Sequence, residues 1–387
     1  MESNGIIKIA DNIISPMGFN SGENMDNVLL GRSALRQHRL WNIPEPFIAS
    51  LFESEELQEL CNRELSPATA MTRFERLATI SAKKAIEESG IDPSSPRVIF
   101  IISTTKGNVE LLGETQLEIP QERITPAISA KVIAGYFGNP NTPVVVSNAC
   151  TSGACAQLLA ARLLNNGYYD YAVVTGAEVQ SKFIISGFQS FKALSPEECR
   201  PFDKERQGLN AGEGAGTIIY RKAFPQEGTT GAWTLISGAI NNDANHISGP
   251  SRTGEGSYKA LMETIKGFDT NKIAFINAHG TATLYNDEME SIAITRAGLN
   301  HIPVNGLKGY YGHTMGAAGI IETIISQRAI EKGIIPATRG FNESGVSGEI
   351  IVSDTSMSTN KKAFLKLLSG FGGCNVALLF KKQEERV

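Results

Sequence analysis

Residues 143–167 read PVVVSNACTSGACAQLLAARLLNNG, and this stretch decides the fold. The β-branched residues 144–146 predict a short buried strand, and the alanine- and leucine-rich residues 153–165 predict a helix. Asn-Ala-Cys-Thr-Ser-Gly, residues 148–153, fits a tight turn between the two. A strand that passes through such a turn into a helix is typical of α/β proteins.

The same alternation continues on both sides of this stretch. Strands are predicted at residues 98–102, 171–174, 217–220, 273–276 and 377–380. Helices are predicted at residues 73–88, 287–297 and 316–331. Glycines that can cap helices follow several of these segments, namely Gly90, Gly167, Gly298 and Gly333. The sequence therefore predicts an α/β architecture with largely buried sheets.

The segment FPQEGTTG, residues 224–231, is the best linker candidate. It holds a proline and two glycines between two apolar runs, which is typical of a connection. We expect the chain to divide there into an N-terminal half, residues 1–225, and a C-terminal half, residues 226–387. Both halves contain strand, glycine turn and helix units, a weak indication of duplication.

Composition narrows the functional classes. The net charge of −4 argues against nucleic acid as a partner. The chain starts without a signal-peptide pattern and has no apolar run near the roughly 18 residues of a membrane helix. We therefore expect a cytoplasmic protein that has no membrane segment.

The five cysteines are scattered and odd in number, which argues against a disulfide framework, and their spacing does not fit a zinc site. Cys150 falls at the predicted start of a helix, where free N–H groups and partial positive charge favour a thiolate. The turn resembles the nucleophile elbow of hydrolases. The local pattern also allows a buried structural cysteine, and Cys155, one turn further on, fits packing better.

Residues 272–291, KIAFINAHGTATLYNDEMES, form the second stretch of interest. His279 follows an apolar strand, and Gly280 lets the chain turn at the rim of a sheet, where ligand sites are common. Thr281 and Thr283 supply hydroxyls, and Glu290 lies on the first turns of the next helix. Taken alone, His279 could equally be a core histidine.

Residues 303–333 form the third stretch, PVNGLKGYYGHTMGAAGIIETIISQRAIEKG. His313 precedes a helix start of small residues, 314–319, which would let another element approach closely. Lys308 lies in the same loop, although a lone lysine is more often a solvated surface residue. His246, in a polar loop, has no clear role from the sequence.

Five motifs in order resemble the β-ketoacyl-acyl carrier protein synthases of the thiolase superfamily, most closely the elongating Cys-His-His type. They are NACTSGA (148–154), GFQSFKALS with RPFDKERQGLNAGEGAG (187–216), NAHGTATLYNDEME (277–290), LKGYYGHTMGAAG (307–319) and SGFGGCN (369–375). The resemblance implies a thiolase-like five-layer αβαβα sandwich of two similar halves, usually a homodimer. It also implies decarboxylative Claisen condensation of an acyl group on Cys150 with a malonyl thioester. Both substrates would arrive on the phosphopantetheine of acyl carrier protein, so no cofactor or metal of its own is expected.

The resemblance also implies individual roles. His279 and His313 would promote decarboxylation, and the backbone N–H groups of Cys150 and Phe371 would form an oxyanion hole. Lys308 would pair with Glu290 and order the site. The substrate-binding residues would be two threonines on the pantetheine arm and two phenylalanines at the entrance: Thr281, Thr283, Phe188 and Phe191.

Two departures from the family pattern concern the site. The usually glycine-rich pocket segment reads Ser-Thr-Thr-Lys-Gly at residues 103–107, and Cys374 replaces the more usual threonine. The pocket segment leaves the acyl-chain preference open, and fatty-acid and polyketide or polyene pathways use the same site. Basic residues after the entrance loop are candidates for carrier docking, although some could be structural: Lys192, Arg200, Lys204 and Arg206.

Three alternatives remain. A degradative thiolase would need a second catalytic cysteine near the C-terminus, and a starter-type synthase would have Asn in place of His313. A non-catalytic chain-length factor would typically lack the nucleophile, whereas Cys150 is present.

Overall fold

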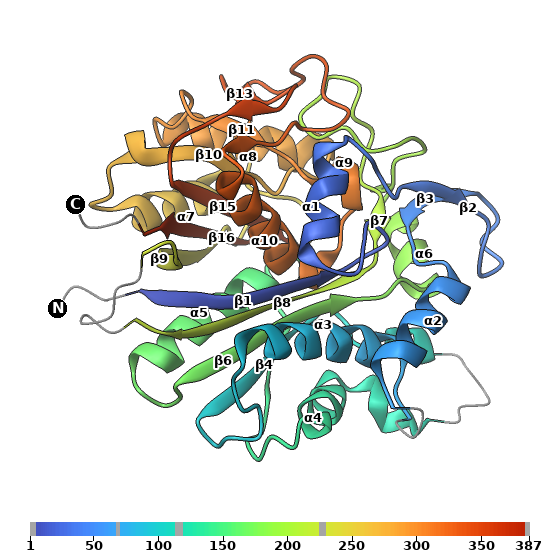
Figure 1. Ribbon diagram of the computed structural model, residues 1–387. Helices are drawn as coiled ribbons and strands as arrows, with labels where there is room; N and C mark the ends of the chain where they lie inside the picture. Colours follow the sequence, from blue (N-terminus) through green and yellow to red (C-terminus); the bar gives the residue numbers. More distant parts are fainter. Residues whose placement is uncertain (1–4, 67–69, 113–118, 224–229, 384–387) are drawn as a thin grey trace.

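A computed structural model describes residues 5–66, 70–112, 119–223 and 230–383 (Figure 1). The strands of the central sheet are β1 (Ile6–Ile14), β4 (Val98–Ser103), β5 (Val144–Val146), β6 (Tyr171–Glu178), β8 (Gly214–Lys222), β9 (Trp233–Asn242), β10 (Ile273–Asn277), β11 (Pro303–Asn305), β13 (Ile351–Val352), β15 (Ala363–Gly370) and β16 (Cys374–Lys382). Short strands outside it are β2 (Arg36–His38), β3 (Phe47–Ser50), β7 (Ala211–Gly212), β12 (Ile334–Ile335) and β14 (Met357–Ser358).

The helices follow the strands in the order expected of an α/β fold. They are α1 (Ser21–Leu29), α2 (Ser54–Glu64), α3 (Arg73–Ser89), α4 (Pro126–Tyr136), α5 (Ser152–Asn165), α6 (Lys182–Ser190), α7 (Glu255–Ile265), α8 (Leu284–Arg296), α9 (Lys308–Tyr311) and α10 (Ala318–Glu331). The short 3₁₀ turns within the described ranges are η1 (Val109–Leu111), η2 (Gln121–Ile124), η3 (Thr270–Lys272) and η4 (Met315–Ala317). Among the residues that the structure describes, no helix has the length and apolar character needed to cross a bilayer.

The central sheet consists of two half-sheets with the same internal order. In the first, the order is β1-β8-β6-β4-β5, and in the second it is β9-β16-β15-β10-β11, with β13 added at the edge. In both, the first two pairings are antiparallel and the next two are parallel. Within the described part of the chain, the half-sheets are joined where Ile6 pairs with Leu235 and Ile7 with Thr234. Strand β4 is therefore the counterpart of β10, and β5 is the counterpart of β11.

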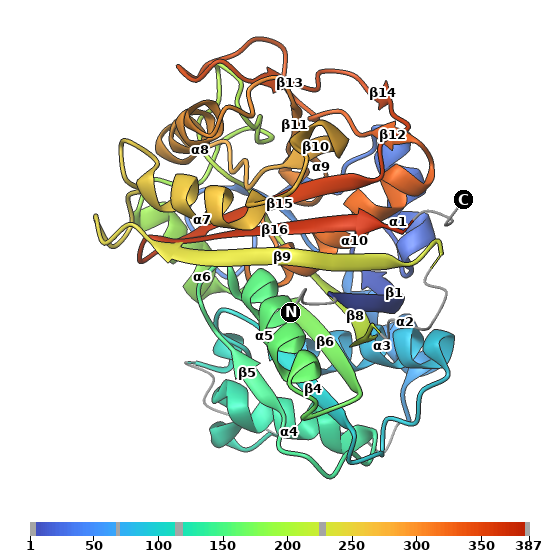
Figure 2. The same ribbon diagram turned by 90° about the vertical axis from the view of Figure 1, so that its left-hand side faces the viewer.

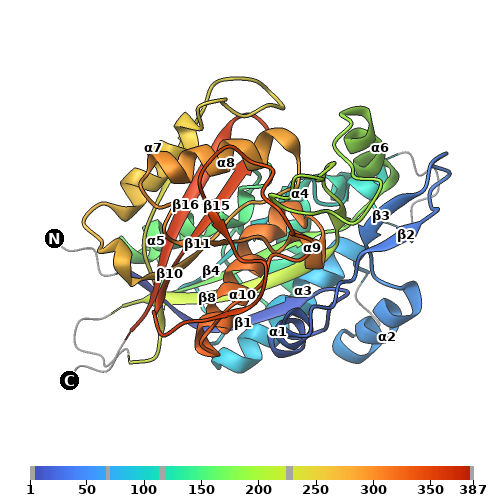
Figure 3. The same ribbon diagram turned by 90° about the horizontal axis from the view of Figure 1, so that it is seen from above.

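Helices separate and cover the two half-sheets. Helices α5 and α10 lie between them and contact strands of both. Helices α3 and α4 cover the outer face of the first half-sheet, and α7 and α8 cover that of the second (Figures 1 and 2). Seen from above, strands β15 and β16 run in a clearly different direction from β1 and β8 (Figure 3). The predicted thiolase-like five-layer αβαβα fold is confirmed.

The two central helices cross closely near their N-termini. A Cβ atom at Gly153 would lie 2.9 Å from the Gly316 carbonyl oxygen, and one at Gly319 would lie 2.5 Å from the Ala154 nitrogen. Both helices also supply the largest core cluster, in which Ile320, Ile321 and Ile324 are fully buried. The close approach predicted from the small residues 314–319 is therefore confirmed, and it brings the starts of α5 and α10 together.

Most predicted elements are present with shifted ends. Helix α8 begins at Leu284 rather than Asp287, because Asp287 is buried and its carboxylate accepts hydrogen bonds from the backbone N–H groups of Phe202 and Ala282. The segment predicted as a helix from residue 316 starts as η4 and becomes α-helical at Ala318. The predicted boundary between residues 225 and 226 lies outside the described residues, so it stays a prediction.

Candidate active site

Cys150 lies in the turn between β5 and α5. The preceding residue, Ala149, has a φ of 46°, a left-handed conformation that is strained for a residue other than glycine. Ser152 holds this turn, since its hydroxyl donates to the Ala149 carbonyl at 2.6 Å and accepts the Asn148 N–H at 2.8 Å. The turn therefore has the strained strand-to-helix geometry of a nucleophile elbow.

His279 lies two residues beyond the end of β10. Gly280 follows it with a φ of 48°, which lets the chain turn over the start of α8. The buried carboxylate of Glu290 accepts the backbone N–H groups of His279 and Gly280, both at 2.7 Å. Glu290 on α8 thus fixes the position of the histidine through the backbone.

His313 lies between helix α9 and η4, in the C-terminal half of the chain. Its backbone N–H donates to the Asn210 carbonyl at 2.7 Å, and its Nδ1 accepts the Met315 N–H at 3.3 Å. Because Nδ1 of the neutral ring is an acceptor, the proton resides on Nε2. That Nε2 is buried and has no hydrogen-bond partner among the described residues, so it is available to a substrate.

These three side chains converge. The Cys150 sulfur, one ring nitrogen of His279 and one ring nitrogen of His313 lie within 4.8 Å of one another, and the centroids of the two imidazole rings are 5.0 Å apart at an interplanar angle of 79°. They border a cavity of about 420 Å³. In the part of the chain that the structure describes, this is the one cluster whose spacing would also suit a metal ion, and the expected absence of a metal stays a prediction.

Burial sets the protonation states of the cluster. It raises the pKa of the Cys150 thiol to about 11, although Lys106 and Lys308 act in the opposite direction. It also lowers the pKa values of His279 and His313 well below the usual range, with Lys308 adding to the effect. The helix terminus was expected to favour a thiolate, but burial outweighs it in the resting protein. The resting cluster is therefore a neutral thiol beside two neutral imidazoles, either of which can accept its proton.

The predicted pairing of Lys308 with Glu290 is wrong. The fully buried ammonium of Lys308 contacts Glu322 of α10 at 2.8 Å and donates to the His279 carbonyl. Glu290 is unsuited to the pair because its oxygens are engaged by backbone N–H groups, and burial raises its pKa to about 7. Lys308 still orders the histidine turn, but through the carbonyl of His279.

Glu322 and Lys366 are site residues that the sequence analysis missed. Lys366 of β15 contacts Glu322 at 2.5 Å and donates to the Ala278 carbonyl at 3.2 Å, so one carboxylate joins two buried lysines under the histidine turn. Burial alone would raise the pKa of Glu322, but Lys308 and Lys366 hold it below its usual value. The sequence could have indicated this pair. Glu322 and Lys366 are each the one charged residue of an apolar segment, GIIETIIS or AFLKLLSG, and buried charges are normally paired.

The predicted substrate-binding residues line the cavity. Thr281 and Thr283 lie there with their hydroxyls 2.8 Å apart. Phe188 and Phe191 face Phe371, with ring centroids 6.1 and 5.6 Å from it. Phe371 is 40% exposed at the tip of the β15–β16 turn, whose Gly372 and Gly373 have φ values of 86° and 79°.

The β15–β16 turn lies against the nucleophile turn. A Cβ atom at Gly370 would be 3.3 Å from the Cys150 nitrogen, so the backbone after Gly370 runs beside that N–H group. His246 also lines the cavity, and Gly372 donates to the carbonyl of the neighbouring Ile247 at 2.7 Å. The oxyanion hole itself stays a prediction.

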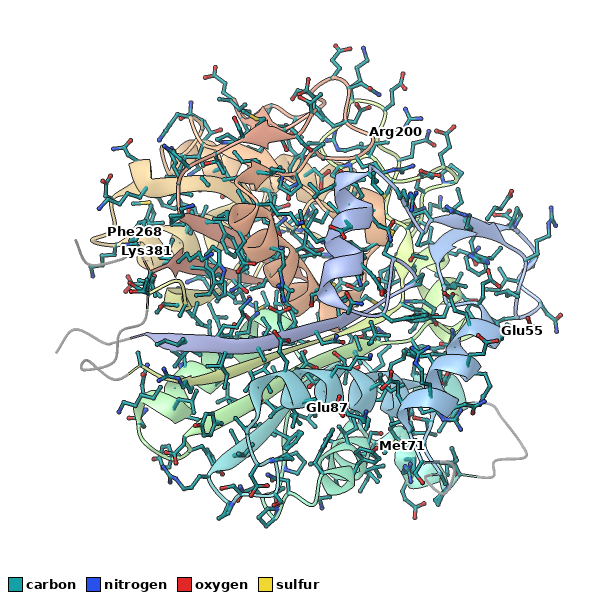
Figure 4. The ribbon with its side chains drawn as sticks, in the orientation of Figure 1. Glu55, Met71, Glu87, Arg200, Phe268 and Lys381 are labelled. Atoms are coloured by element: carbon teal, nitrogen blue, oxygen red, sulfur yellow. The ribbon has the colours of Figure 1, made fainter. Side chains whose placement is uncertain are left out.

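Three of the four basic docking candidates are engaged elsewhere. Arg200, at the outer edge of the molecule (Figure 4), pairs with Glu197 and Glu205, and Lys204 pairs with Glu343. Arg206 is buried and donates to three backbone carbonyls. Lys192 alone of the four lines the cavity.

Cys155 and Cys374 lie beside the site rather than in the cluster. Both sulfurs contact the Asn148 amide nitrogen, at 3.4 and 2.9 Å, and both are buried. Neither belongs to the group that contains the two histidines. The arrangement therefore lacks the second cavity-facing cysteine that a degradative thiolase would need.

A thiolase-like fold with a Cys-His-His cluster defines the class of the protein as a condensing enzyme. Its sequence matches the family model for the beta-ketoacyl synthase N-terminal domain over residues 11–223 and that for the C-terminal domain over residues 234–342. The 3-oxoacyl-[acyl-carrier-protein] synthase 2 of Synechocystis sp. is 30% identical over 348 residues, covering 82% of this chain and 83% of the relative. The chain therefore belongs to the beta-ketoacyl synthase family and is an acyltransferase of the condensing type.

Solved structures show the same fold. A ketosynthase in complex with its chain length factor from Xenorhabdus doucetiae aligns with a TM-score of 0.83 and 24% identity, covering 98% of each chain. A type II PKS acyl-carrier protein in complex with its ketosynthase bound to the hexaketide gives a TM-score of 0.83 and 20% identity, covering 99% of this chain and 100% of the other.

Proposed function

We propose that the protein transfers an acyl group from an acyl carrier protein to Cys150. It then condenses this acyl group with a malonyl thioester that arrives on a second molecule of acyl carrier protein. The convergence of the Cys150 sulfur with one ring nitrogen each of His279 and His313 within 4.8 Å carries this proposal. A sulfur nucleophile is well suited to thioesters because it both attacks and leaves readily. The presence of the nucleophile disfavours a non-catalytic chain-length factor.

The first half-reaction needs a proton acceptor, because Cys150 rests as a thiol. A neutral imidazole takes the proton, the thiolate attacks the acyl carbonyl, and the carrier thiol leaves with a proton. The oxyanion of the tetrahedral intermediate accepts hydrogen bonds from the backbone N–H groups of Cys150 and Phe371.

The second half-reaction uses both histidines as hydrogen-bond donors. The malonyl thioester loses carbon dioxide, and negative charge passes to its carbonyl oxygen. Nε2–H of His313 is free to donate to that oxygen, and His279 lies close enough to act with it. The resulting carbanion attacks the acyl-enzyme, and the Cys150 thiolate leaves.

The substrates supply the only prosthetic arm in this scheme, and no cofactor of the protein is required. Thr281 and Thr283 hold the phosphopantetheine arm in the cavity.

All five cysteines are free thiols, which supports a reducing compartment and hence a cytoplasmic location. Strand β5 lies at the edge of the central sheet with Val144–Val146 only partly buried, and this edge is the contact surface of our proposed homodimer.

Intact-protein mass spectrometry tests the assignment. After incubation with an acyl-carrier substrate, we expect one acyl adduct on the wild-type protein and none on Cys150→Ala. Adding malonyl-carrier substrate should discharge the adduct and yield a 3-oxoacyl product. An adduct of equal yield on Cys155 or Cys374 would contradict the proposal.

A further inference from the structure

The segment after β4 occupies a special place in the repeat. Strands β4 and β10 are counterparts, so residues 104–106 follow β4 as residues 278–280 follow β10. The second segment brings His279 into the site. The first segment carries Lys106.

Three contacts hold this segment and the preceding Ser103 against the site, and a fourth lies within the segment. The Ser103 hydroxyl donates to the Gly316 carbonyl at 3.0 Å, and the Ser147 hydroxyl donates to the Thr105 carbonyl at 3.1 Å. The Lys106 ammonium contacts the Thr105 hydroxyl at 2.7 Å and the Met315 sulfur at 3.7 Å. Since Met315 also donates its N–H to His313, the ammonium lies beside the His313 turn.

Among the described residues, this ammonium makes no ion pair at contact distance. Over residues 5–66, 70–112, 119–223 and 230–383, no carboxylate lies within the 4.0 Å of an ion pair with Lys106, and the side chain is half-buried. Glu178 is the nearby carboxylate: burial raises its pKa, and Lys106 is the largest effect in the opposite direction, but the carboxylate accepts its hydrogen bonds from the Thr104 hydroxyl and the Thr105 N–H rather than from Lys106. By contrast, Lys308 is already paired with Glu322.

The charged groups around Cys150 favour a role for Lys106. Burial raises the pKa of Cys150, and Lys106 exerts the largest opposing effect, followed by Lys308. Glu178 adds to the effect of burial, while His279 and His313 are neutral. Lys106 therefore makes no ion pair among the described residues and lies beside the turn of His313, one ring nitrogen of which is within 4.8 Å of the Cys150 sulfur. The reactive form of Cys150 is an anion, which a nearby cation favours.

We propose that Lys106 is a positioning residue for acyl transfer, whose ammonium stabilises the Cys150 thiolate after the proton passes to an imidazole. No bond to Lys106 forms or breaks: the proton moves from sulfur to ring nitrogen, and the thiolate then displaces the carrier thiol from the acyl carbonyl. This inference rests on the proposed role of Cys150.

Alkylation by iodoacetamide tests it without any carrier protein. The rate of Cys150 labelling is measured from neutral to alkaline pH, with the label located by peptide mass spectrometry. In Lys106→Met, we expect labelling near neutral pH to slow on the order of tenfold and the pH profile to move to higher pH. Lys106→Arg should follow the wild type because it keeps the charge. Lys182→Met, which removes an exposed charge at the start of α6, is the matched control and should also follow the wild type.

The outcomes separate the two proposals. An unchanged pH profile in Lys106→Met would overturn the role of Lys106, and so would equal slowing in the Met and Arg variants with a lowered melting temperature, which marks a structural role. Label on a cysteine other than Cys150 in the wild type would instead overturn the proposed nucleophile.

Discussion

At the scale of single residues, the two histidines are held by different contacts and still present their rings to one cavity. Backbone N–H groups bonded to Glu290 fix the turn of His279, whereas the Met315 N–H fixes the ring of His313. Both rings are neutral because of burial. A neutral imidazole can either accept the thiol proton or donate to an enolate oxygen, so the pair suits both half-reactions.

Single alanine variants at His279 or His313 should therefore separate the two half-reactions. The remaining imidazole lies within 4.8 Å of Cys150 and can still accept its proton, so acylation should persist. Loss of one donor to a developing oxyanion costs on the order of 10²–10³ in rate, so release of carbon dioxide from malonyl thioester should fall by that factor. The measurements are the acyl adduct by mass spectrometry and carbon dioxide release. Wild-type decarboxylation in either variant would count against the assignment.

Glu322 offers a test of stability at the same scale. Glu322→Gln leaves Lys308 and Lys366 buried without a negative partner, and breaking such a pair costs roughly 3–5 kcal/mol. We expect a lower free energy of unfolding in denaturant titration, together with lower activity. The matched control is Glu263→Gln on the exposed side of α7, which should change the free energy by no more than about 0.5 kcal/mol. Equal stability of the two variants would refute the two-lysine arrangement.

These residues also show which parts of the site the sequence could predict. Cys150 and His279 each follow a predicted strand, and all three residues lie near a glycine, a local pattern that is visible in the sequence. The ion-pair partner of Lys308 cannot be read from the local sequence, because Glu290 and Glu322 lie at similar distances from it along the chain. The packing of α10 against the histidine turn makes Glu322 the partner.

At the scale of elements, the site depends on how closely α5 and α10 approach. The starts of both helices lie against each other beside Cys150 and His313. Glycines at positions 153 and 319 permit this approach because a Cβ atom at either position would meet backbone atoms. The helices and their glycine caps were predictable from sequence periodicity, and Gly90, Gly167, Gly298 and Gly333 all have positive φ values. The start of α8 could not be predicted correctly, because Asp287 resembles a helix-capping residue in the sequence but is buried inside the helix.

Gly319→Ala tests this crossing. The added methyl group would lie 2.5 Å from the Ala154 nitrogen and 2.9 Å from the Gly153 carbonyl carbon, so a backbone must move. We expect a loss of about 1–3 kcal/mol in the free energy of unfolding and slower acylation of Cys150, since the start of α5 shifts. Gly135→Ala in α4 is the control, because a Cβ atom there meets nothing within 4 Å, and it should be neutral or stabilising by about 0.4–1 kcal/mol. A fully active and stable Gly319→Ala protein would contradict the crossing.

At the scale of the whole molecule, loops that follow equivalent strands in the two halves form one site. Cys150 follows β5 and His279 follows β10, while His313 comes after β11, the counterpart of β5, with helix α9 between them. The order of motifs along the chain predicted that these segments belong to one site. Their convergence depends on the packing of one half-sheet against the other across α5 and α10, which no local sequence pattern specifies.

The last prediction concerns how a carrier protein would reach this site. The chain is itself acidic, with a net charge of −4, so attraction to an acidic carrier must come from a local positive charge. Lys192 is such a charge at the cavity, beside Phe191. Lys192→Glu should raise the apparent KM for acyl-carrier substrate, more at low salt than at high salt, because salt screens steering. A short pantetheine thioester should react normally, and Lys182→Glu, with the same charge change at the other end of α6, should leave both substrates unaffected. If Lys192→Glu impairs both substrates equally, Lys192 shapes the entrance and the carrier docks elsewhere.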